Sequence, residues 1–528
     1  MKYINLTLSS FEEIIKQNTV YVDKTNYLYE IISKPDKYYF LSRPRRFGKS
    51  LTVSTLKAIF EGKRELFNGL YISKTDWQWE KYPIIQFDFN GIPSSSNEIL
   101  IKSIDEKINE IAKKNNIKLS TKETTKKFKE LILKLNKRHK KGVVILVDEY
   151  DKPIINHLGT GEERLKIGIK NREFLKEFYD NLKEANVSEA IKLVFITGVS
   201  KFSKVSIFSA LNNLIELDIH PEFSAMLGYT QEELEKNFQE HLEDFSKKQN
   251  QSIEKTIEEF KYWYDGFRFT EKEIRVYNPF SIGRALSYGK IDNYWFDSGT
   301  PTFLINLIKE KKYYIPELKR LKINKEKLRA YEIEKIEIEP LLYQTGYLTI
   351  KEVEEEIYIL TYPNYEVERS FEINLIDGIT ERKIETVKIN EVKKALIKGE
   401  YKEFFEIIKQ LFKQIPSTII PKKTAEREQY YHTIFYLIMN LMSDNKLKVR
   451  SEILGSDSRV DMLIEVNNKI YIIEFKCGQS AARAVKQIKE KKYAEQFRDS
   501  KKEIKLVGIN FDTRIKNIKE WKIEKDKK

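Results

Sequence analysis

Short apolar runs alternate with helical stretches over the first 220 residues of the chain. The runs are rich in β-branched and aromatic residues, which buried strands favour. They are KYYFLSR (37–43), YPIIQFDFN (82–90), GVVILVDEY (142–150), IKLVFITGVS (191–200) and NNLIELDI (212–219). Strands that alternate with helices predict an α/β domain with a largely parallel sheet.

The pattern becomes helical and charged from GYTQEELEKNF (228–238) onward. Aromatic residues then crowd around glycine and proline in KYWYDGFRF (261–269) and VYNPFSIGRAL (276–286), which predicts a helical subdomain with defined turns. Residues 320–420 mix helices with a few strands such as EIYILTYPN (356–364). We interpret them as a connecting domain.

Two prolines, Pro416 and Pro421, bracket a predicted hinge before the last part of the chain. That part contains an apolar helix, a strand, two strands joined by the short turn NNK, an amphipathic helix and a further strand. The two joined strands, SRVDMLIEV (458–466) and IYIIEFKCG (470–478), predict a hairpin.

Most of the formal charge of +14 lies near the end of the chain of 528 residues. Residues 421–528 hold 25 Lys and Arg against 16 Asp and Glu, whereas the preceding 420 residues hold 69 against 64. This balance favours a polyanionic partner for the last part. A general enrichment in lysine from an AT-rich genome is the alternative.

The single cysteine, Cys477, excludes an internal disulfide and suits a reducing compartment. The start, MKYINLTLSSFEEIIKQ, lacks the apolar core of a signal peptide, and no run approaches 18 apolar residues. We therefore expect a cytoplasmic protein with no membrane partner.

A phosphate-binding loop is predicted by YYFLSRPRRFGKSLTVSTLKAIF (38–60), which reads as strand, loop and helix. The helix opens at Gly48, and a helix N-terminus offers free N–H groups and a positive dipole to a phosphate. Lys49 would reach the β- and γ-phosphates of a nucleotide, and the Ser50 hydroxyl would bind Mg²⁺.

The loop departs from the standard P-loop pattern at its first position. Arg43 stands there in place of glycine, and Arg45 and Arg46 add positive charge. Of these arginines, Arg46 is the candidate nucleotide contact.

An acidic pair, Asp148 and Glu149, follows the apolar run Val143–Val147. The carboxyl end of a strand is where a P-loop ATPase places an aspartate that organises Mg²⁺ and a glutamate that polarises water. Thr197 or Ser200, at the end of a later strand, is placed to sense the γ-phosphate, and simple termination of that strand is the alternative.

A second acidic pair lies on the predicted hairpin. Glu474 and Lys476 share one face of their strand, and the hairpin brings Asp461 beside them. Two carboxylates on adjacent strands chelate Mg²⁺, which activates water at a phosphodiester. Lys476 would orient or deprotonate that water and neutralise the developing anion. The alternative is that these charges mark the exit of a strand into solvent.

The helices on either side of the hairpin supply accessory candidates. Glu428, His432, Phe435 and Met439 recur at helical spacing, so Glu428 lies on a largely apolar face where an unpaired acid is unfavourable. The alternative is that Glu428 reaches solvent from the first turn. Gln487, on the following helix, is placed to contact the metal-bound phosphate region.

These segments together resemble a known prokaryotic family. It joins an AAA-ATPase-like domain, in which the first P-loop glycine is also absent, to a C-terminal PD-(D/E)XK nuclease domain with a restriction-endonuclease-like αβββαβ core. The resemblance is carried by FEEIIKQNTVYVDKT (11–25), RPRRFGKS (43–50), VDEYDKP (147–153), FITGVSKFS (195–203), YDGFRF (264–269), YNPFS (277–281), YYHTIFYLI (430–438) and EFK (474–476).

The resemblance implies four domains and two sets of site residues. The domains are an AAA-ATPase-like P-loop domain (1–225), a helical lid subdomain (226–310), a connecting domain (311–420) and the nuclease domain (421–528). Asp461, Glu474 and Lys476 would be catalytic, Glu428 and Gln487 accessory. The ATP site would use Arg46, Gly48, Lys49, Ser50, Asp148, Glu149 and Thr197. Tyr493 comes six residues after Gln487 where related nucleases have Gln-x-x-x-Tyr, so that motif does not transfer directly.

We therefore expect an ATP-binding protein fused to a DNA nuclease that depends on Mg²⁺ or Mn²⁺, with the nucleotide gating cleavage through the lid and connecting domain. The family's frequent interpretation as a mobile-element or defence component suggests foreign DNA as the target. One alternative is a nucleotide-dependent switch that binds nucleic acid or protein without cutting. Cleavage of RNA is a third possibility, and the sequence leaves homo-oligomerisation open.

Overall fold

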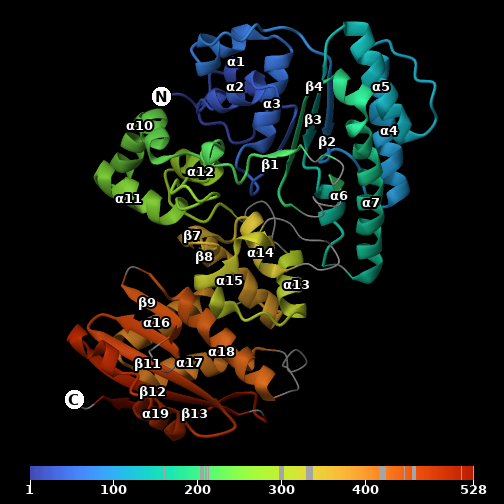
Figure 1. Ribbon diagram of the computed structural model, residues 1–528. Coiled ribbons are helices and arrows are strands. Elements are labelled where there is room, and N and C mark those ends of the chain that lie inside the picture. The colour runs from blue at the N-terminus through green and yellow to red at the C-terminus, as the bar shows by residue number, and fades with distance from the viewer. Residues whose placement is uncertain are drawn as a thin grey trace. The chain divides into compact units, whose positions relative to one another are not determined.

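The structure is a computed structural model. It describes residues 1–159, 161–201, 207–208, 211, 213–295, 302–328, 337–383, 385–415, 424–444, 446–454, 459–512 and 514–526. The chain forms two compact units (Figure 1). The first unit comprises Met1–Leu304 and Leu321–Glu368, and the second comprises Ile305–Arg320 and Arg369–Lys528. The predicted hinge between Pro416 and Pro421 lies outside the described residues.

A parallel five-stranded sheet forms the centre of the first unit, with the strand order β2-β3-β4-β1-β5. Each of the five predicted apolar runs contains one strand, which confirms the α/β interpretation. The central strands are almost wholly buried, as expected for a parallel sheet covered on both faces. The strands are β1 (Tyr38–Ser42), β2 (Ile84–Asp88), β3 (Val143–Asp148), β4 (Ile191–Gly198) and β5 (Ile215–Glu216).

Helices cover both faces of this sheet. Figure 1 shows α1, α2 and α3 on one side and α4, α5 and α7 on the other, and α3 and α5 both pack against β3. The helices are α1 (Phe11–Lys16), α2 (Thr25–Ser33), α3 (Lys49–Phe60), α4 (Asn97–Lys114), α5 (Thr124–His139), α6 (Lys152–Ile155), α7 (Glu162–Asp180) and α8 (Ala185–Ala190).

A group of helices follows the sheet, as the charged helical pattern predicts. They are α10 (Gln231–Lys248), α11 (Ile253–Tyr264) and α12 (Pro279–Tyr288). Thr230 and Glu233 form a capping box at the start of α10, and Asn278 caps α12. The three helices share one buried core that includes Phe238, Phe260 and Tyr277.

A small antiparallel sheet with the order β6-β8-β7 also belongs to the first unit. Its strands are β6 (Leu321–Asn324), β7 (Thr349–Glu354) and β8 (Ile357–Thr361). The helices between residues 302 and 413 are α13 (Thr302–Glu310), α14 (Ile338–Gln344), α15 (Tyr365–Thr380), α16 (Thr386–Lys398) and α17 (Tyr401–Lys413). The 3₁₀ helix η6 spans Ile315–Arg320.

The second unit is built on a mixed sheet with the order β13-β12-β11-β10-β9. Strands β11 and β12 are parallel, and the other neighbours are antiparallel. The elements follow the predicted order: α18 (Thr424–Leu441), β9 (Leu447–Leu454), β10 (Arg459–Val466), β11 (Lys469–Cys477), α19 (Ala481–Glu490) and β12 (Glu503–Asp512). An edge strand, β13 (Asn517–Lys525), was not predicted, because its charged residues hide the strand pattern.

Helices pack against both faces of the second sheet. Ile470 and Ile472 of β11 lie in one core with Val485 and Ile488 of α19. On the opposite face, Phe475 of β11 contacts residues of α18. Strand β11 is therefore held from both sides. Among the described residues, no helix combines the length and apolar character needed to cross a bilayer.

Candidate functional site

The loop between β1 and α3 has the conformation that its glycine permits. Gly48 adopts a φ of 95° immediately before α3, in a region that favours glycine because it lacks a Cβ. Lys49 is buried, and its Nζ donates to the carbonyls of Arg43 and Pro44 at 2.9 and 3.0 Å. Burial lowers the pKa of Lys49, and the charges of Glu149 and Asp148 oppose that shift.

Arg43, at the position of the missing glycine, points into the protein. Its side chain is buried and donates to the carbonyls of Ser42 and Asp218 at 3.0 Å each. The guanidinium also lies 4.2 Å from the ring centre of Phe269. Arg43 therefore stabilises the loop from inside the protein and does not line the cavity described next.

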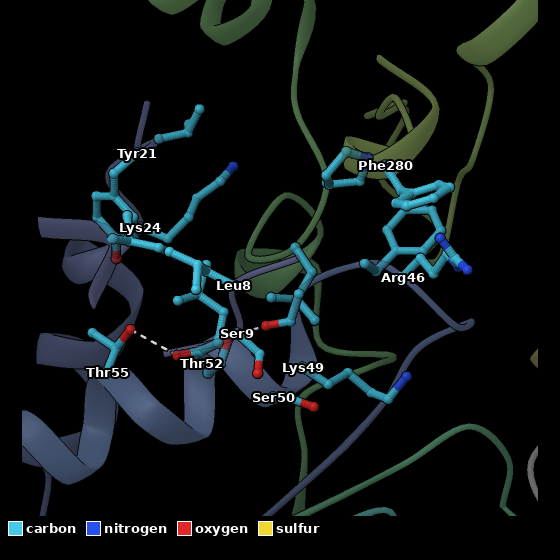
Figure 2. Close-up of a pocket in the computed structure, with 18 of the residues that line it drawn as sticks. Leu8, Ser9, Tyr21, Lys24, Arg46, Lys49, Ser50, Thr52, Thr55 and Phe280 are labelled. Carbon is cyan, nitrogen blue, oxygen red and sulfur yellow. Dashed lines mark hydrogen bonds between the residues drawn. The ribbon is translucent and has the colours of Figure 1, made fainter. Parts of the chain in front are cut away.

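A cavity of about 450 Å³ lies beside this loop, within the usual size range of small-molecule sites. Gly48, Lys49, Ser50 and Glu149 line one part of it. Figure 2 shows the Arg46 side chain against the ring of Phe280, and its guanidinium carbon lies 3.5 Å from the ring centre. The remaining wall includes Leu6, Leu8, Tyr21, Lys24, Leu227 and Tyr229.

The two acidic residues at the end of β3, Asp148 and Glu149, lie in different environments. Asp148 is buried, and its Oδ1 accepts a 2.6 Å hydrogen bond from the Thr197 hydroxyl on β4. These two predicted residues thus meet each other but do not line the cavity. Glu149 does line it, with a φ of 51° that is uncommon outside glycine. Burial raises the pKa of Glu149, against the charge of Lys49.

The second candidate site lies on the hairpin of β10 and β11. Met462 pairs with Ile473, so Asp461 and Glu474 follow at the same end of the ladder. The Oδ2 atom of Asp461 accepts from the Phe475 amide at 2.8 Å. The Oε1 atom of Glu474 accepts from Lys476 Nζ at 2.7 Å. The structure thus brings the predicted Asp461, Glu474 and Lys476 together.

Glu474 is the most unusual group at this site. It is only 2% exposed, and its Oε2 atom is buried without a hydrogen-bond partner among the described residues. Burial, followed by the charge of Asp461, raises its pKa to about 7, although Lys476 acts in the opposite direction. A buried oxygen without a partner is costly unless a ligand binds it.

Helix α19 brings Gln487 to the same carboxylate. Gln487 Nε2 donates to Oε1 of Glu474. This approach depends on Gly508, which pairs with Glu474 across the ladder of β11 and β12. A Cβ at Gly508 would lie 2.2 Å from the carbonyl oxygen of Ala481, at the start of α19. Tyr493 lies beyond α19 and packs in the core of the unit.

Glu428, the accessory acid of α18, has an exposed side chain, as the alternative interpretation proposed. Desolvation nevertheless raises its pKa, and the charges of Lys476 and Asp461 act on it, so Glu428 lies near the carboxylate pair. It makes no hydrogen bond or ion pair with another described residue.

The hairpin site suits a hard divalent cation. Its donors are the oxygens of Asp461 and Glu474, and no described residue bonds to the buried Oε2 of Glu474. Within the described ranges, no three His, Cys, Asp or Glu side chains form a group able to hold a metal. Mg²⁺ is commonly bound through one or two carboxylates and several waters, so a pair of carboxylates fits it.

The sequence interpretation missed several residues that shape the two sites. The N-terminal segment around Leu6 and Leu8 carries no local motif, although it forms a wall of the cavity. Gly508 is a lone glycine within a strand, a signal that can mark a close backbone approach. His432 served only as a marker of helical spacing, yet its Nε2 lies 3.2 Å from the carbonyl oxygen of Asp461.

The two folds define an ATPase-like domain followed by a nuclease-like domain. Residues 5–208 match a family model described as "Predicted AAA-ATPase", and residues 426–521 match one for the PD-(D/E)XK nuclease superfamily. The chain is also similar to "Uncharacterized protein in vnfD 5'region" of Azotobacter chroococcum mcd 1, with 32% identity over 513 residues, which cover 96% of this chain and 95% of that protein. The chain belongs to the family that joins an AAA-ATPase-like domain to a C-terminal PD-(D/E)XK nuclease domain.

Proposed function

We propose that the protein binds ATP in the cavity beside Lys49 and cleaves DNA at Asp461, Glu474 and Lys476, with the nucleotide controlling cleavage. The observation that carries the nuclease part is the buried Glu474, which has Lys476 on one oxygen and, among the residues that the structure describes, no partner on the other. A buried carboxylate oxygen without a hydrogen-bond partner calls for an explanation, and a bound cation supplies one.

The residues of the hairpin have separate tasks in this proposal. A bound Mg²⁺ or Mn²⁺ would supply Lewis-acid stabilisation and a water of lowered pKa. Asp461 and Glu474 hold the cation, and Gln487 orients Glu474 through its hydrogen bond. The ammonium group of Lys476 stabilises the negative charge that develops on the phosphate.

The nuclease is tested with linear and circular DNA, in Mg²⁺ or Mn²⁺, with and without ATP. The wild-type protein should cleave, and Lys476→Ala should not. Lys486→Ala, which removes an exposed lysine of α19, is the matched control and should cleave normally. If no condition yields cleavage by the wild type while nucleotide still binds, the switch function replaces this proposal. Cleavage of RNA but not DNA would change the substrate.

The ATPase part has its own test. Glu149 lines the cavity, where it can polarise water, whereas Asp148 and Thr197 bond to each other and do not line it. Glu149→Gln should retain bound nucleotide and release phosphate at least about 100-fold more slowly, the usual contribution of a general base. Equal phosphate release by both proteins would make Glu149 a structural end of β3.

A further inference from the structure

We propose that His432 and Tyr314 are positioning residues for Asp461, and that the segment Ile305–Arg320 thereby controls the candidate nuclease site. The proposal rests on the proposed nuclease function and concerns its regulation.

A chain of two hydrogen bonds leads from this segment to the site. The Tyr314 hydroxyl lies 2.7 Å from Nδ1 of His432, and Nε2 of His432 lies 3.2 Å from the carbonyl oxygen of Asp461. A carbonyl oxygen only accepts, so Nε2 carries the proton. In the neutral ring Nδ1 then accepts from the tyrosine. Both nitrogens are thus used, which fixes the tautomer and the orientation of the ring.

Packing also holds the histidine in place. His432 is buried, and its ring centre lies 4.8 Å from that of Phe475, the residue between Glu474 and Lys476. The ring centre of Phe435, one turn further along α18, lies 5.1 Å from that of Phe475. A shift of His432 must therefore move either the Asp461 backbone or the strand that carries Glu474.

The segment that supplies Tyr314 has an unusual course along the chain. Residues 305–320 belong to the second unit, whereas the residues before and after them, up to Leu304 and from Leu321, belong to the first. Two further bonds fasten the segment: Lys319 donates to Asn440 of α18 at 2.6 Å, and the Pro316 carbonyl accepts from Ser451 of β9 at 3.4 Å.

The first unit is therefore tied by peptide bonds to both ends of a segment that contacts α18 and β9. A change in the first unit that pulls on this segment reaches Asp461 through Tyr314 and His432. Displacement of a catalytic group by about 1 Å can reduce a rate by about 100-fold, so small movements suffice for control.

Three variants test the positioning role. His432→Leu removes both hydrogen bonds, His432→Gln keeps an N–H near the place of Nε2, and Tyr314→Phe removes only the hydroxyl. Tyr401→Phe is the matched control, because it removes a tyrosine hydroxyl bonded to Tyr471 in the same unit but outside this chain of bonds.

The first readout is Mn²⁺ binding to the metal-free protein by calorimetry, and the second is cleavage. His432→Leu should weaken Mn²⁺ binding and lower kcat by about 10- to 100-fold, the usual effect of residues behind a metal site, with KM for DNA nearly unchanged. His432→Gln should recover most of both. Wild-type Mn²⁺ affinity in His432→Leu, or an equal loss in Tyr401→Phe, would overturn the positioning role.

Control by the segment is read from the ratio of cleavage rates with and without ATP. That ratio should move toward 1 in Tyr314→Phe and stay at the wild-type value in Tyr401→Phe. An unchanged ratio in Tyr314→Phe would overturn the control. If the wild type cleaves nothing, the proposed function fails by itself, and Mn²⁺ binding still decides whether His432 positions Asp461.

Discussion

At the residue scale, Arg43 has a structural role at a P-loop position that is usually glycine. Glycine is usual where a loop must pass close to a phosphate, because it has no side chain. Here the side chain does not line the cavity, and its guanidinium donates to three carbonyl groups, those of Ser42, Asp218 and Phe223, and lies against the Phe269 ring. The arginine that replaces the standard glycine thus stabilises the loop through contacts inside the protein.

Restoring the standard glycine should therefore damage the protein. Arg43→Gly would leave the Asp218 carbonyl without this donor and open a cavity beside Phe269. We expect a loss of about 3 kcal/mol in stability, from buried carbonyls left without their donor and from the new cavity, together with weaker ATP binding. Thermal unfolding and nucleotide titration measure both effects. Tighter ATP binding by the variant would contradict this interpretation.

Glu474 predicts a pH dependence of metal binding. Its pKa is raised to about 7, so the carboxyl is increasingly protonated as the pH falls below that value. A proton must leave before a metal binds, and the apparent Mn²⁺ affinity should therefore fall about tenfold between pH 8 and pH 6. Calorimetry on the metal-free protein measures this change. A constant affinity over that range would mean that Glu474 stays ionised or does not bind the metal.

At the scale of elements, the contact between α19 and β12 places the site. Gly508 lets the helix start lie directly on the strand, opposite Glu474. Gly508→Ala should push α19 away from the sheet, lower stability by about 1–3 kcal/mol, as overpacking does, and separate Gln487 from Glu474.

For Gly508→Ala, we measure Mn²⁺ affinity, the rate of cleavage and thermal stability. Ala482→Gly is the control, because it weakens α19 by up to about 1 kcal/mol without a clash. The first variant should lose metal affinity well beyond the control. Equal metal affinity in both would show that the position of α19 is not critical.

The sequence predicts those elements whose signals are local. The apolar run Val143–Val147 and the charged helical pattern from residue 228 onward specify a buried strand and a helix without reference to the rest of the chain. The placement of Asp461 and Glu474 at the same end of the hairpin also follows, because a short turn sets the register of a hairpin.

Other features depend on partners that are distant in sequence. Arg43 stacks on Phe269, and Gly508 meets Ala481, so neither role can be read from neighbouring residues. Strand β13 is charged along much of its length, and only its pairing with β12 makes it a strand. Tyr314 gains its importance from a contact with His432, 118 residues later.

At the scale of the whole molecule, the compact unit around the hairpin is larger than the matched nuclease segment. Phe405 of α17 stacks on Trp521 at 4.6 Å, and Phe412 lies 5.4 Å from Phe511. Residues before the predicted boundary at 421 therefore complete the core of this unit.

A fragment of residues 421–528 should consequently lack a stable fold, because it exposes the apolar surface that α16 and α17 cover. A fragment of residues 369–528 should fold better, yet bind Mn²⁺ more weakly than the full chain because it lacks Tyr314. Near-ultraviolet circular dichroism and calorimetry compare the fragments. Cooperative unfolding of 421–528 alone would place the domain boundary at 421 after all.

The course of residues 305–320 has a consequence for the inheritance of the gene. A single genetic crossover between the two units would separate the segment from the helix and strand that it fastens. Exchange of the second unit for another therefore requires three breakpoints, one on either side of the segment and one between residues 368 and 369, or it combines residues that do not pack together. Selection should accordingly preserve the two units as one block, and the similarity to the Azotobacter protein extends over 96% of this chain.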